Sequence, residues 1–445
     1  MIVCMKKVFR DICYSFGNFS GGIVNYAMMT WFTFYYVDRL GLEVKYYAIA
    51  MVIYGAWNAI NDPLMGVISD KTVSRWGRRK PYMMFGAVPL GLSLVLLFAP
   101  PEAVTASPVM LFIFFVAGLC IYDTFFTMTM LAWSAVLPEM YLDEANRARV
   151  NVYSQILGVL GAMLATLAAE MLINAFGFIA MAAVFGAIGI ITMLMSAWGV
   201  REREVNIKGG SFSFVKSFTT TFSNKAFLIC VIAVMCVEVG TAICTSTVAF
   251  YSKYAMNFEM GVTVIMGSLF VSSMVFAPLI GVLCRKIGAK NTYILAIGIF
   301  AVSAFGFYIA PSIVLAVIVA VAAGIGVSGV MIMPNMLYAE VIDDDQVRTG
   351  VRREGAFFGM NALVMRLSII IQGWVTAFIW DRSGYVEGAS TQSASAVSGI
   401  RAMMGLVPLA FAIPAVIIMI FYPMNKQRLA EVQEKVRLMN EEKSL

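Results

Sequence analysis

The sequence predicts an all-α membrane protein in which twelve transmembrane helices form two pseudo-symmetric bundles of six. Composition is the first observation: 60% of the 445 residues are hydrophobic, 13% are charged, and the mean hydropathy is +0.83. A soluble fold has too small an interior to bury this much apolar surface, and a disordered chain would carry more charge. The other two observations are the lengths of the apolar stretches and a repeat between the two halves of the chain.

Apolar stretches of about 20 residues are long enough to cross a bilayer as helices. The chain has twelve, six on either side of a polar segment, at 11–36, 44–69, 82–100, 108–137, 148–175, 177–199, 226–252, 259–284, 291–311, 312–341, 354–380 and 400–422. We therefore expect an N-terminal bundle (1–199), a central cytoplasmic loop (200–225), a C-terminal bundle (226–423) and a cytoplasmic tail (424–445). The apolar spacing in the tail predicts an amphipathic helix that lies along the membrane or on the cytoplasmic face.

Lys and Arg are distributed unevenly between the two sides of the predicted membrane. Nearly all of the 32 basic residues fall in loops and tails on the side of the termini, and Arg366 alone lies deep within a span. The other side holds Arg39, Lys45, Lys253, Arg382 and Arg401. Because cytoplasmic loops are enriched in Lys and Arg, both termini are expected in the cytoplasm. The expected location is the plasma membrane, which in a Gram-negative bacterium is the inner membrane.

The chain has no His, which excludes His-based zinc sites, Ser–His–Asp triads and histidine proton relays. It also has no GxxxxGK[ST] motif, so ATP is not the expected energy source. The seven Cys are odd in number and contain no CxxC pair, which is typical of reduced core residues. We expect neither an enzyme nor a cofactor, metal site or nucleic-acid partner, and the default state is a monomer in the lipid bilayer.

Corresponding loops of the two halves carry similar charge patterns. Gly66 to Lys80 follows the second span, and a Gly- and Arg/Lys-containing loop at 281–290 follows the eighth. The fourth and tenth spans end in acid, acid and Arg at the same spacing of four residues: Glu139, Asp143 and Arg147, and Glu340, Asp344 and Arg348. Two six-span repeats predict a transporter with its site at the midplane between the bundles. The candidate gating residues are Gly66, Asp70, Arg75, Gly77, Arg78, Glu139, Arg147, Glu340, Asp344 and Arg348.

Each candidate gate has an alternative structural interpretation. Asp70 ends the second span and can accept hydrogen bonds from helix N-terminal amides or pair with an Arg, which would latch one access state. The alternative is an ordinary acid in a positively charged cytoplasmic loop. The two acid–Arg sets allow Asp to Arg pairing at i, i+4, and as isolated surface pairs they would contribute at most about 1 kcal/mol.

The residues Asn58 to Gly66, followed by Ser74 to Pro81 with Arg75-Trp76-Gly77, carry a family resemblance. Further matches are Tyr14-x-Phe16-Gly17, Trp133-Ser134, Leu137-Pro138-Glu139, the stretch from Asp343 to Gly355, and Gly399-Ile400-Arg401. The chain resembles the glycoside–pentoside–hexuronide:cation symporters of the major facilitator superfamily along essentially its whole length. The resemblance implies the major facilitator fold and cation-driven transport of a sugar, glycoside or sugar acid by alternating access.

Charged residues inside spans are functional candidates because burying them in the membrane is costly. The resemblance places the coupling cation at positions matching Asn58, Asn61 and Asp62. The family's best-known member has a second carboxylate where this chain has Asn58, and a Thr where it has Phe126. One acid with two amides is a weaker Na+ cage, so H+ coupling through Asp62 is the preferred hypothesis and Na+ the second. The alternative is a structural acid hydrogen-bonded to Asn61 or to another helix.

The resemblance also marks a rewritten substrate pocket. The family's two sugar-binding acids correspond to Gly22 and Thr129, its helix 5 Arg to Gln155 and its helix 11 Lys to Arg366, whereas Trp133 is retained. From the residues themselves, the remaining pocket candidates are the polar or aromatic side chains Asn18, Asn25, Tyr26, Asp123 and Glu238.

Arg366 is always charged and needs a counter-charge inside the membrane. We expect it to pair with Glu238, Asp62 or Asp123, either as a latch that an anionic substrate displaces or as a permanent salt bridge. Glu170, near the end of its helix, is expected at the interface rather than in a site. A second function is transport of a lysolipid or other amphiphile, which fits the loss of the sugar-binding acids, and a non-transporting membrane sensor is a remote third.

Overall fold

A computed structural model describes residues 2–72, 74–141, 144–200, 221–350, 353–424 and 426–444. The regular elements in this part of the chain are helical throughout. They are α1 (Ile2–Thr33), η1 (Phe34–Arg39), α2 (Val44–Lys71), α3 (Lys80–Leu97), α4 (Glu102–Thr105), α5 (Pro108–Met140), α6 (Glu144–Gly199), α8 (Lys225–Phe250), η2 (Tyr251–Met256), α9 (Gly261–Ile287), α10 (Ala289–Ile309), α11 (Ile313–Thr349), α12 (Glu354–Ser383), α13 (Ala394–Ile420) and α14 (Lys426–Ser444). The two η elements are short π-helical turns.

Nine helices in the described residues are long and apolar enough to cross a membrane. One of them, α6, contains two of the expected spans, because Gly177 at φ 86° and ψ 174° breaks its helical path. The helices α1 and α2 are not among the nine, since amides such as Asn18, Asn25 and Asn61 interrupt their apolar runs. Helices therefore occupy all twelve expected positions, and the all-α membrane fold is confirmed.

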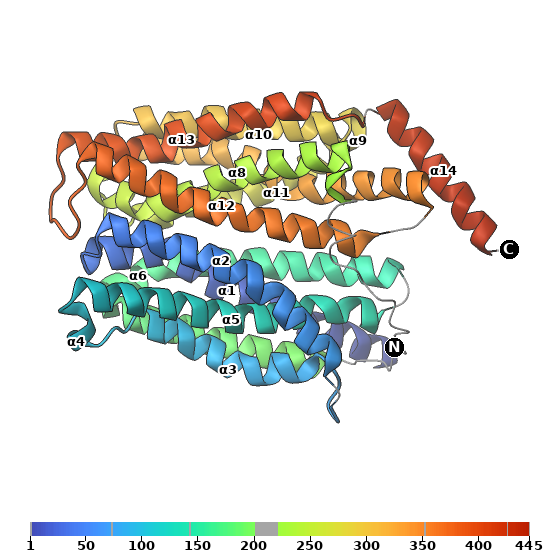
Figure 1. Ribbon diagram of the computed structural model, residues 1–445, viewed down its shortest axis with the longest axis horizontal. Coiled ribbons are helices and arrows are strands. Elements are labelled where there is room, and N and C mark those ends of the chain that lie inside the picture. The colour runs from blue at the N-terminus through green and yellow to red at the C-terminus, as the bar shows by residue number, and fades with distance from the viewer. Residues whose placement is uncertain are drawn as a thin grey trace.

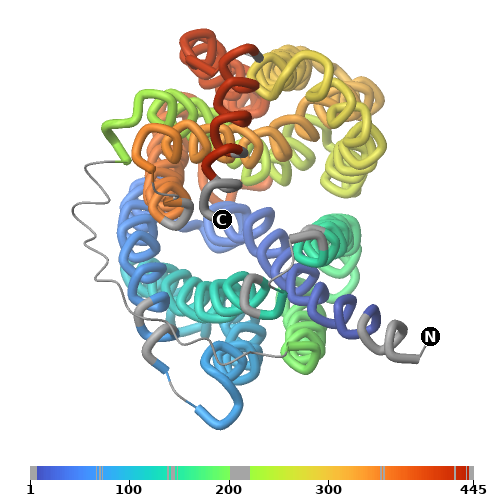
Figure 2. The backbone as a smooth tube through the Cα atoms, turned by 90° about the vertical axis from the view of Figure 1, so that its right-hand side faces the viewer, coloured from blue at the N-terminus to red at the C-terminus, as the bar shows by residue number. Residues whose placement is uncertain are grey.

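The helices of the two halves form two stacked groups. In Figure 1, α1 to α6 lie below and α8 to α13 above, and both ends of the chain lie at the right. We call this the terminal end and the other the opposite end. Figure 2 views the molecule from the terminal end, with α14 crossing the C-terminal group. Which end faces the cytoplasm and where the bundles are divided remain predictions, and residues 201–220 of the central loop lie outside the described residues.

Close packing inside the N-terminal half depends on small residues where α1 crosses α6. A Cβ at Gly22 would collide with the backbone carbonyl of Gly158, and one at Gly161 would collide with the carbonyl of Phe19. Small residues of this kind let membrane helices approach closely, because there is little water-driven attraction between helices in lipid. The pair α1 and α6 therefore forms one rigid unit.

Contacts between the halves involve few helix pairs. Helix α2 packs against α12, α1 against α8, and α6 against α9. The predicted tail helix is confirmed as α14, which packs on the C-terminal half next to α11. Its Val432 is 5% exposed and belongs to the core of that half.

Candidate functional site

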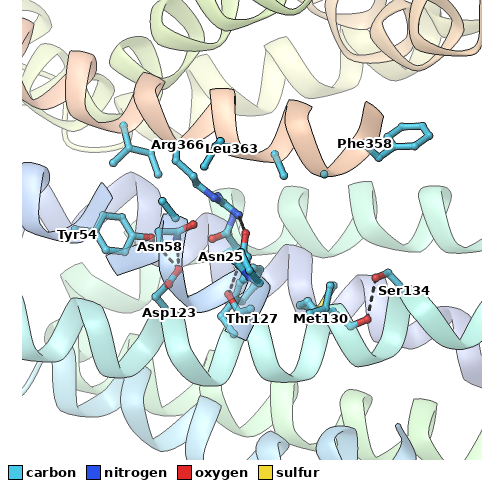
Figure 3. Close-up of a pocket in the computed structure, with 18 of the residues that line it drawn as sticks. Asn25, Tyr54, Asn58, Asp123, Thr127, Met130, Ser134, Phe358, Leu363 and Arg366 are labelled. Carbon is cyan, nitrogen blue, oxygen red and sulfur yellow. Dashed lines mark hydrogen bonds and ion pairs between the residues drawn. The ribbon is translucent and has the colours of Figure 1, made fainter. Parts of the chain in front are cut away.

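A cavity of about 650 Å³ lies between α1, α2, α5 and α12. Its volume falls in the range of small-molecule sites. Its wall runs from Arg366 toward Ser134 and Phe358, near the ends of α5 and α12 that lie at the terminal end (Figure 3). The polar side chains that line it are Asn25, Tyr54, Asn58, Asp62, Tyr122, Asp123, Thr127, Ser134 and Arg366.

Arg366 of α12 forms an ion pair with Asp62 of α2, so the contact joins the two halves of the chain. Thr127 of α5 donates a hydrogen bond to the other Asp62 oxygen at 2.9 Å. Of the three acids expected to pair with Arg366, the structure selects Asp62. The two side chains are 29% and 24% exposed, so the pair faces the cavity rather than the protein core.

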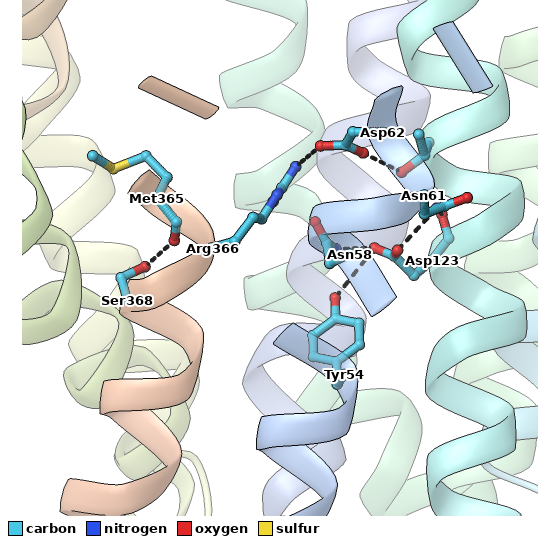
Figure 4. A network of polar contacts seen from close by, with 9 residues as sticks. Tyr54, Asn58, Asn61, Asp62, Asp123, Met365, Arg366 and Ser368 are labelled. Atoms are coloured by element: carbon cyan, nitrogen blue, oxygen red, sulfur yellow. Dashed lines mark hydrogen bonds and ion pairs between the residues drawn. The ribbon is translucent and has the colours of Figure 1, made fainter. Parts of the chain in front are cut away.

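Asp123 of α5 has a separate set of partners, shown in Figure 4. Asn58 and Asn61 of α2 donate their side-chain amides to its two carboxylate oxygens, the latter at 3.0 Å. The hydroxyl of Tyr54 lies 3.5 Å from the oxygen that Asn58 contacts. The two amides expected beside Asp62 therefore contact Asp123 instead. Asp123 is 3% exposed, so its carboxylate is almost fully enclosed.

A second cavity of about 520 Å³ adjoins the first and extends into the C-terminal half. The two cavities share Asn25, Tyr54 and Arg366 in their walls. Glu238 and Tyr26, both predicted from the sequence, line the second cavity. Within the described residues Glu238 has no hydrogen-bond or ion-pair partner, and Tyr26 makes an edge contact with Phe270. Arg366 therefore lies between a paired acid and an unpaired one.

Five of the predicted substrate-binding residues lie outside both cavities: Asn18, Gly22, Thr129, Trp133 and Gln155. Four of them make packing or backbone contacts. Asn18 donates to the carbonyl of Ser154 at 2.9 Å, and Thr129 donates to carbonyls of its own helix. Gly22 lies at the α1–α6 crossing, and Gln155 is exposed.

Trp133 packs inside the N-terminal half, with its indole stacked on Tyr14 at 5.3 Å between ring centroids. Its indole N–H donates to the Tyr14 carbonyl at 2.9 Å, and the Tyr14 hydroxyl donates to the Trp133 carbonyl at 2.8 Å. It is 8% exposed. In this conformation a substrate-stacking role has no open ring face, so that role remains a prediction.

The expected gating residues of the N-terminal half are only partly described. The side chains of Asp70 and Glu139, and residue Asp143, lie outside the described residues. Arg147 donates to the carbonyl of Tyr141 at 3.2 Å, and Arg75 stacks on Trp76. Gly77 has φ 106°, a conformation that favours glycine, whereas Gly66 leaves open space and Arg78 lies in the same loop. Their latch function remains a prediction.

The matching set of the C-terminal half makes contact with the end of the chain. Asp344 pairs with Arg348 at 2.8 Å, which is the expected i, i+4 pairing, and with Arg428 of α14 at 3.1 Å. Glu340 accepts a hydrogen bond from Tyr422 at 3.3 Å. All of these residues belong to one half, so in this conformation the set holds the tail and does not bridge the bundles.

The bundles are joined by ions at the opposite end, at residues that sequence reasoning missed. Lys253 of η2 pairs with Asp38 of η1 at 2.6 Å, and Tyr254 and Tyr385 donate to the same carboxylate, the latter at 2.7 Å. We call Asp38, Lys253, Tyr254 and Tyr385 the opposite-end cluster. Burial and the Asp38 charge raise the pKa of Tyr385, so its phenol keeps the proton that it donates.

Two further contacts close the opposite end. The carboxylate of Glu170 accepts from the backbone N–H of Thr263 at 2.8 Å, which satisfies one free amide at the start of α9. Glu170 is 4% exposed, so it is buried between the halves and does not face the lipid interface. Glu387 accepts from the N–H of Val44 at 2.9 Å in the same manner. The cavity therefore extends toward the terminal end, while the opposite end is held shut.

The signal that could have found the opposite-end cluster was present in the basic residues. Lys253 is one of five basic residues on the sparsely charged side, and Asp38 ends the first span as Lys253 ends the seventh. The two lie in matching π-helical turns of the two halves.

Comparison with known proteins agrees with this arrangement. Residues 13–426 match the family model described as MFS/sugar transport protein. A glucuronide carrier protein homolog of Escherichia coli (strain K12) is 24% identical, with 94% of this chain and 93% of the relative covered. An isoprimeverose transporter of Lactiplantibacillus pentosus is 22% identical, with 95% and 90% covered.

Solved structures share the fold at lower identity. A crystal structure of a nucleoside transporter superposes with a TM-score of 0.66 at 16% identity, covering 94% of this chain and 98% of that one. A proton-dependent oligopeptide transporter gives 0.67 at 13% identity, with 97% and 100% covered. The family match spans nearly the whole chain, and the chain accordingly belongs to the sugar transport family of the major facilitator superfamily, as a multi-pass membrane transporter and not an enzyme.

Proposed function

We propose that this protein is a secondary active symporter of an acidic sugar, such as a hexuronate or its glycoside, coupled to a small cation. H+ is the preferred cation and Na+ the second candidate. The observation that carries the proposal is the Arg366–Asp62 pair, which joins the two halves inside a cavity of sugar size. The carboxylate-bearing substrate of the glucuronide carrier relative supports the same substrate class.

Arg366 serves as the anion receptor in this proposal. Its guanidinium presents a planar fork of N–H donors that fits a carboxylate in a bidentate manner. A substrate carboxylate would displace Asp62, and the sugar hydroxyls would meet the amide of Asn25 and the hydroxyls of Thr127 and Ser134 in the same cavity. The remainder of the wall is apolar, with Phe126 and Met130 on α5 suited to a sugar face.

Alternating access follows from where the halves touch. The opposite-end cluster and the Glu170 contact close one side, while the cavity extends to the other. Release of the substrate at the terminal end would let Asp62 return to Arg366. A rocking motion of the bundles would then need to break the opposite-end cluster and form new contacts near the terminal end, where the predicted latch residues lie.

Ligand-induced thermal stabilisation of the purified protein tests the proposal. We expect glucuronate or a glucuronide to raise the melting temperature, since a ligand that binds the folded state stabilises it by mass action. Glucose, which lacks the carboxylate, should give a smaller shift. The variant Arg366→Gln should lose the difference between the two sugars, and Arg382→Gln, an exposed Arg of the same helix, should keep it.

Two results would refute the proposal. One is equal stabilisation by glucose and glucuronate. The other is stabilisation by lysophosphatidylcholine without any response to sugars, which would favour the amphiphile alternative. Uptake into proteoliposomes with an imposed pH gradient or Na+ gradient then identifies the cation.

A further inference from the structure

The site contains two carboxylates with different surroundings, and this difference allows their roles to be separated. Asp62 is paired with the guanidinium of Arg366, which balances its charge. Asp123, in contrast, accepts hydrogen bonds within the described residues only from neutral groups: two amides and a phenol. A buried carboxylate that lacks its own cationic partner is costly, and the cost falls when a cation or proton binds to it.

Two unsatisfied oxygens lie beside Asp123. The side-chain oxygens of Asn58 and Asn61 are buried and accept no hydrogen bond from any described residue. The two residues are 3% and 0% exposed. Buried amide oxygens of native proteins nearly always have a partner, so two orphans next to one carboxylate need an explanation.

A half-turn of either amide would supply that explanation. The amide nitrogens now face the Asp123 carboxylate, because two oxygens would repel each other (Figure 4). If Na+ lay between them, or a proton lay on Asp123, the rotated amide oxygens would become ligands or acceptors. Carboxylate, amide and hydroxyl oxygens are the hard donors that such cations take. The cluster thus has one stable arrangement without a cation and a second one with it.

We propose that Asp123, with Asn58, Asn61 and Tyr54, binds the coupling cation, while Asp62 serves as the counter-ion that the substrate displaces from Arg366. The inference rests on the proposed function for the role of Arg366 but not for the cation site itself. It relocates the carboxylate of the site from α2 to α5: the acid that the resemblance leads one to expect at position 58 is supplied from the facing helix.

The arrangement also explains how cation and substrate are coupled. In the first cavity, the charges of Asp62, Asp123 and Arg366 sum to one negative. An anionic sugar at Arg366 adds a second negative charge in the same enclosed space, and one monovalent cation at Asp123 restores the original sum. Asn61 and Asp62 are consecutive on α2, so the two events take place on one turn of one helix.

Other ionisable groups face Asp123 from each packed element. Tyr54 lies on α2 together with Asp62, Arg366 lies on α12, and Cys120 and Tyr122 share α5 with Asp123. Because the phenols and the thiol are neutral, the charged groups that act on Asp123 are Asp62 and Arg366. A loss of cation dependence in an Asp123 variant is therefore distinguishable from a change at Asp62.

The test measures melting temperature against cation in the absence of substrate, which keeps it independent of the proposed function. One arm titrates Na+ against choline at constant pH, and the other varies pH in Na+-free buffer. We expect the wild type to respond in one arm, which identifies the cation. Asp123→Asn should lose the response, Asp62→Asn should retain it, and Glu102→Gln, an exposed acid of α4, should match the wild type.

A swap variant protects the test against simple misfolding. Moving the acid across the site in Asn58→Asp/Asp123→Asn should restore the cation response that Asp123→Asn lacks. The proposal is overturned if Asp123→Asn, eluting as a folded monodisperse protein, responds like the wild type. It is equally overturned if the response is lost in Asp62→Asn and kept in Asp123→Asn. Failure of acidic sugars to bind would instead overturn the proposed function and leave these cation readouts standing.

Discussion

Removing the charge of Asp38 should open the end of the molecule that is shut in this conformation. Asp38→Asn keeps the shape of the side chain but removes the counter-charge of Lys253, 2.6 Å away, and weakens the bond from Tyr385 at 2.7 Å. A hydrogen bond to a charged group contributes about 1.5–3 kcal/mol. The Lys253 side chain is 33% exposed, which places the pair near the lower half of this range, at about 2 kcal/mol. Such a change shifts the equilibrium between closed and open states by roughly 30-fold.

The assay is labelling of a cysteine behind the opposite-end cluster. Phe34 is 4% exposed and packs against Phe250 of the other half at 5.1 Å between ring centroids. In a background without native cysteines, Phe34→Cys should react with a maleimide about 30 times faster when Asp38→Asn is added. Glu43→Gln is the matched control, because its exposed pair with Lys45 lies within one half and should leave the rate unchanged.

An unchanged labelling rate in Asp38→Asn would refute the reasoning. It would mean that the apolar contacts and the Glu170 cap close the opposite end without help from the ion pair. A slower rate would refute it as well, since loss of the pair can stabilise the closed state only if the pair favours opening.

Three further predictions concern packing and coupling. Gly22→Val should lower the melting temperature by several degrees in a thermal denaturation, because its Cβ would collide with the Gly158 carbonyl, whereas Gly281→Ala, with open space around it, should not. Trp133→Phe should cost about 1 kcal/mol in denaturant unfolding, through loss of the indole bond to the Tyr14 carbonyl, and should leave substrate affinity unchanged in a binding titration. Uptake of an acidic sugar with one monovalent cation should be electroneutral, so that a valinomycin-imposed membrane potential leaves the initial rate in proteoliposomes unaltered.

The parts of the fold set by local sequence were predictable. Runs of about 20 apolar residues are sufficient to place membrane helices, and they did so even where α6 joins two spans at Gly177. Arg366 and its three possible acids were also predictable, because charge inside a span is rare. The choice of Asp62 was not, since it depends on how α12 meets α2 in space.

Predictions made by matching positions to the family were less informative about the pocket. Gly22 and Thr129 occupy places where the family has sugar-binding acids, but here they face neighbouring helices. Once the polar groups at such positions are replaced by small ones, the helix can turn that face toward packing. The Asp38–Lys253 pair lay beyond sequence reasoning for another reason: its members are 215 residues apart and no local spacing links them.

The attachment of α14 determines what a label on the end of this chain would report. Arg428 binds Asp344, and Val432 is buried against α11, so the last helix is fastened to one half of the molecule (Figure 1). It therefore behaves as a lever arm carried by that half. A fluorophore at the exposed Gln427 would sweep with the C-terminal bundle relative to one placed on the N-terminal half, and would make each conformational cycle visible as a change in distance.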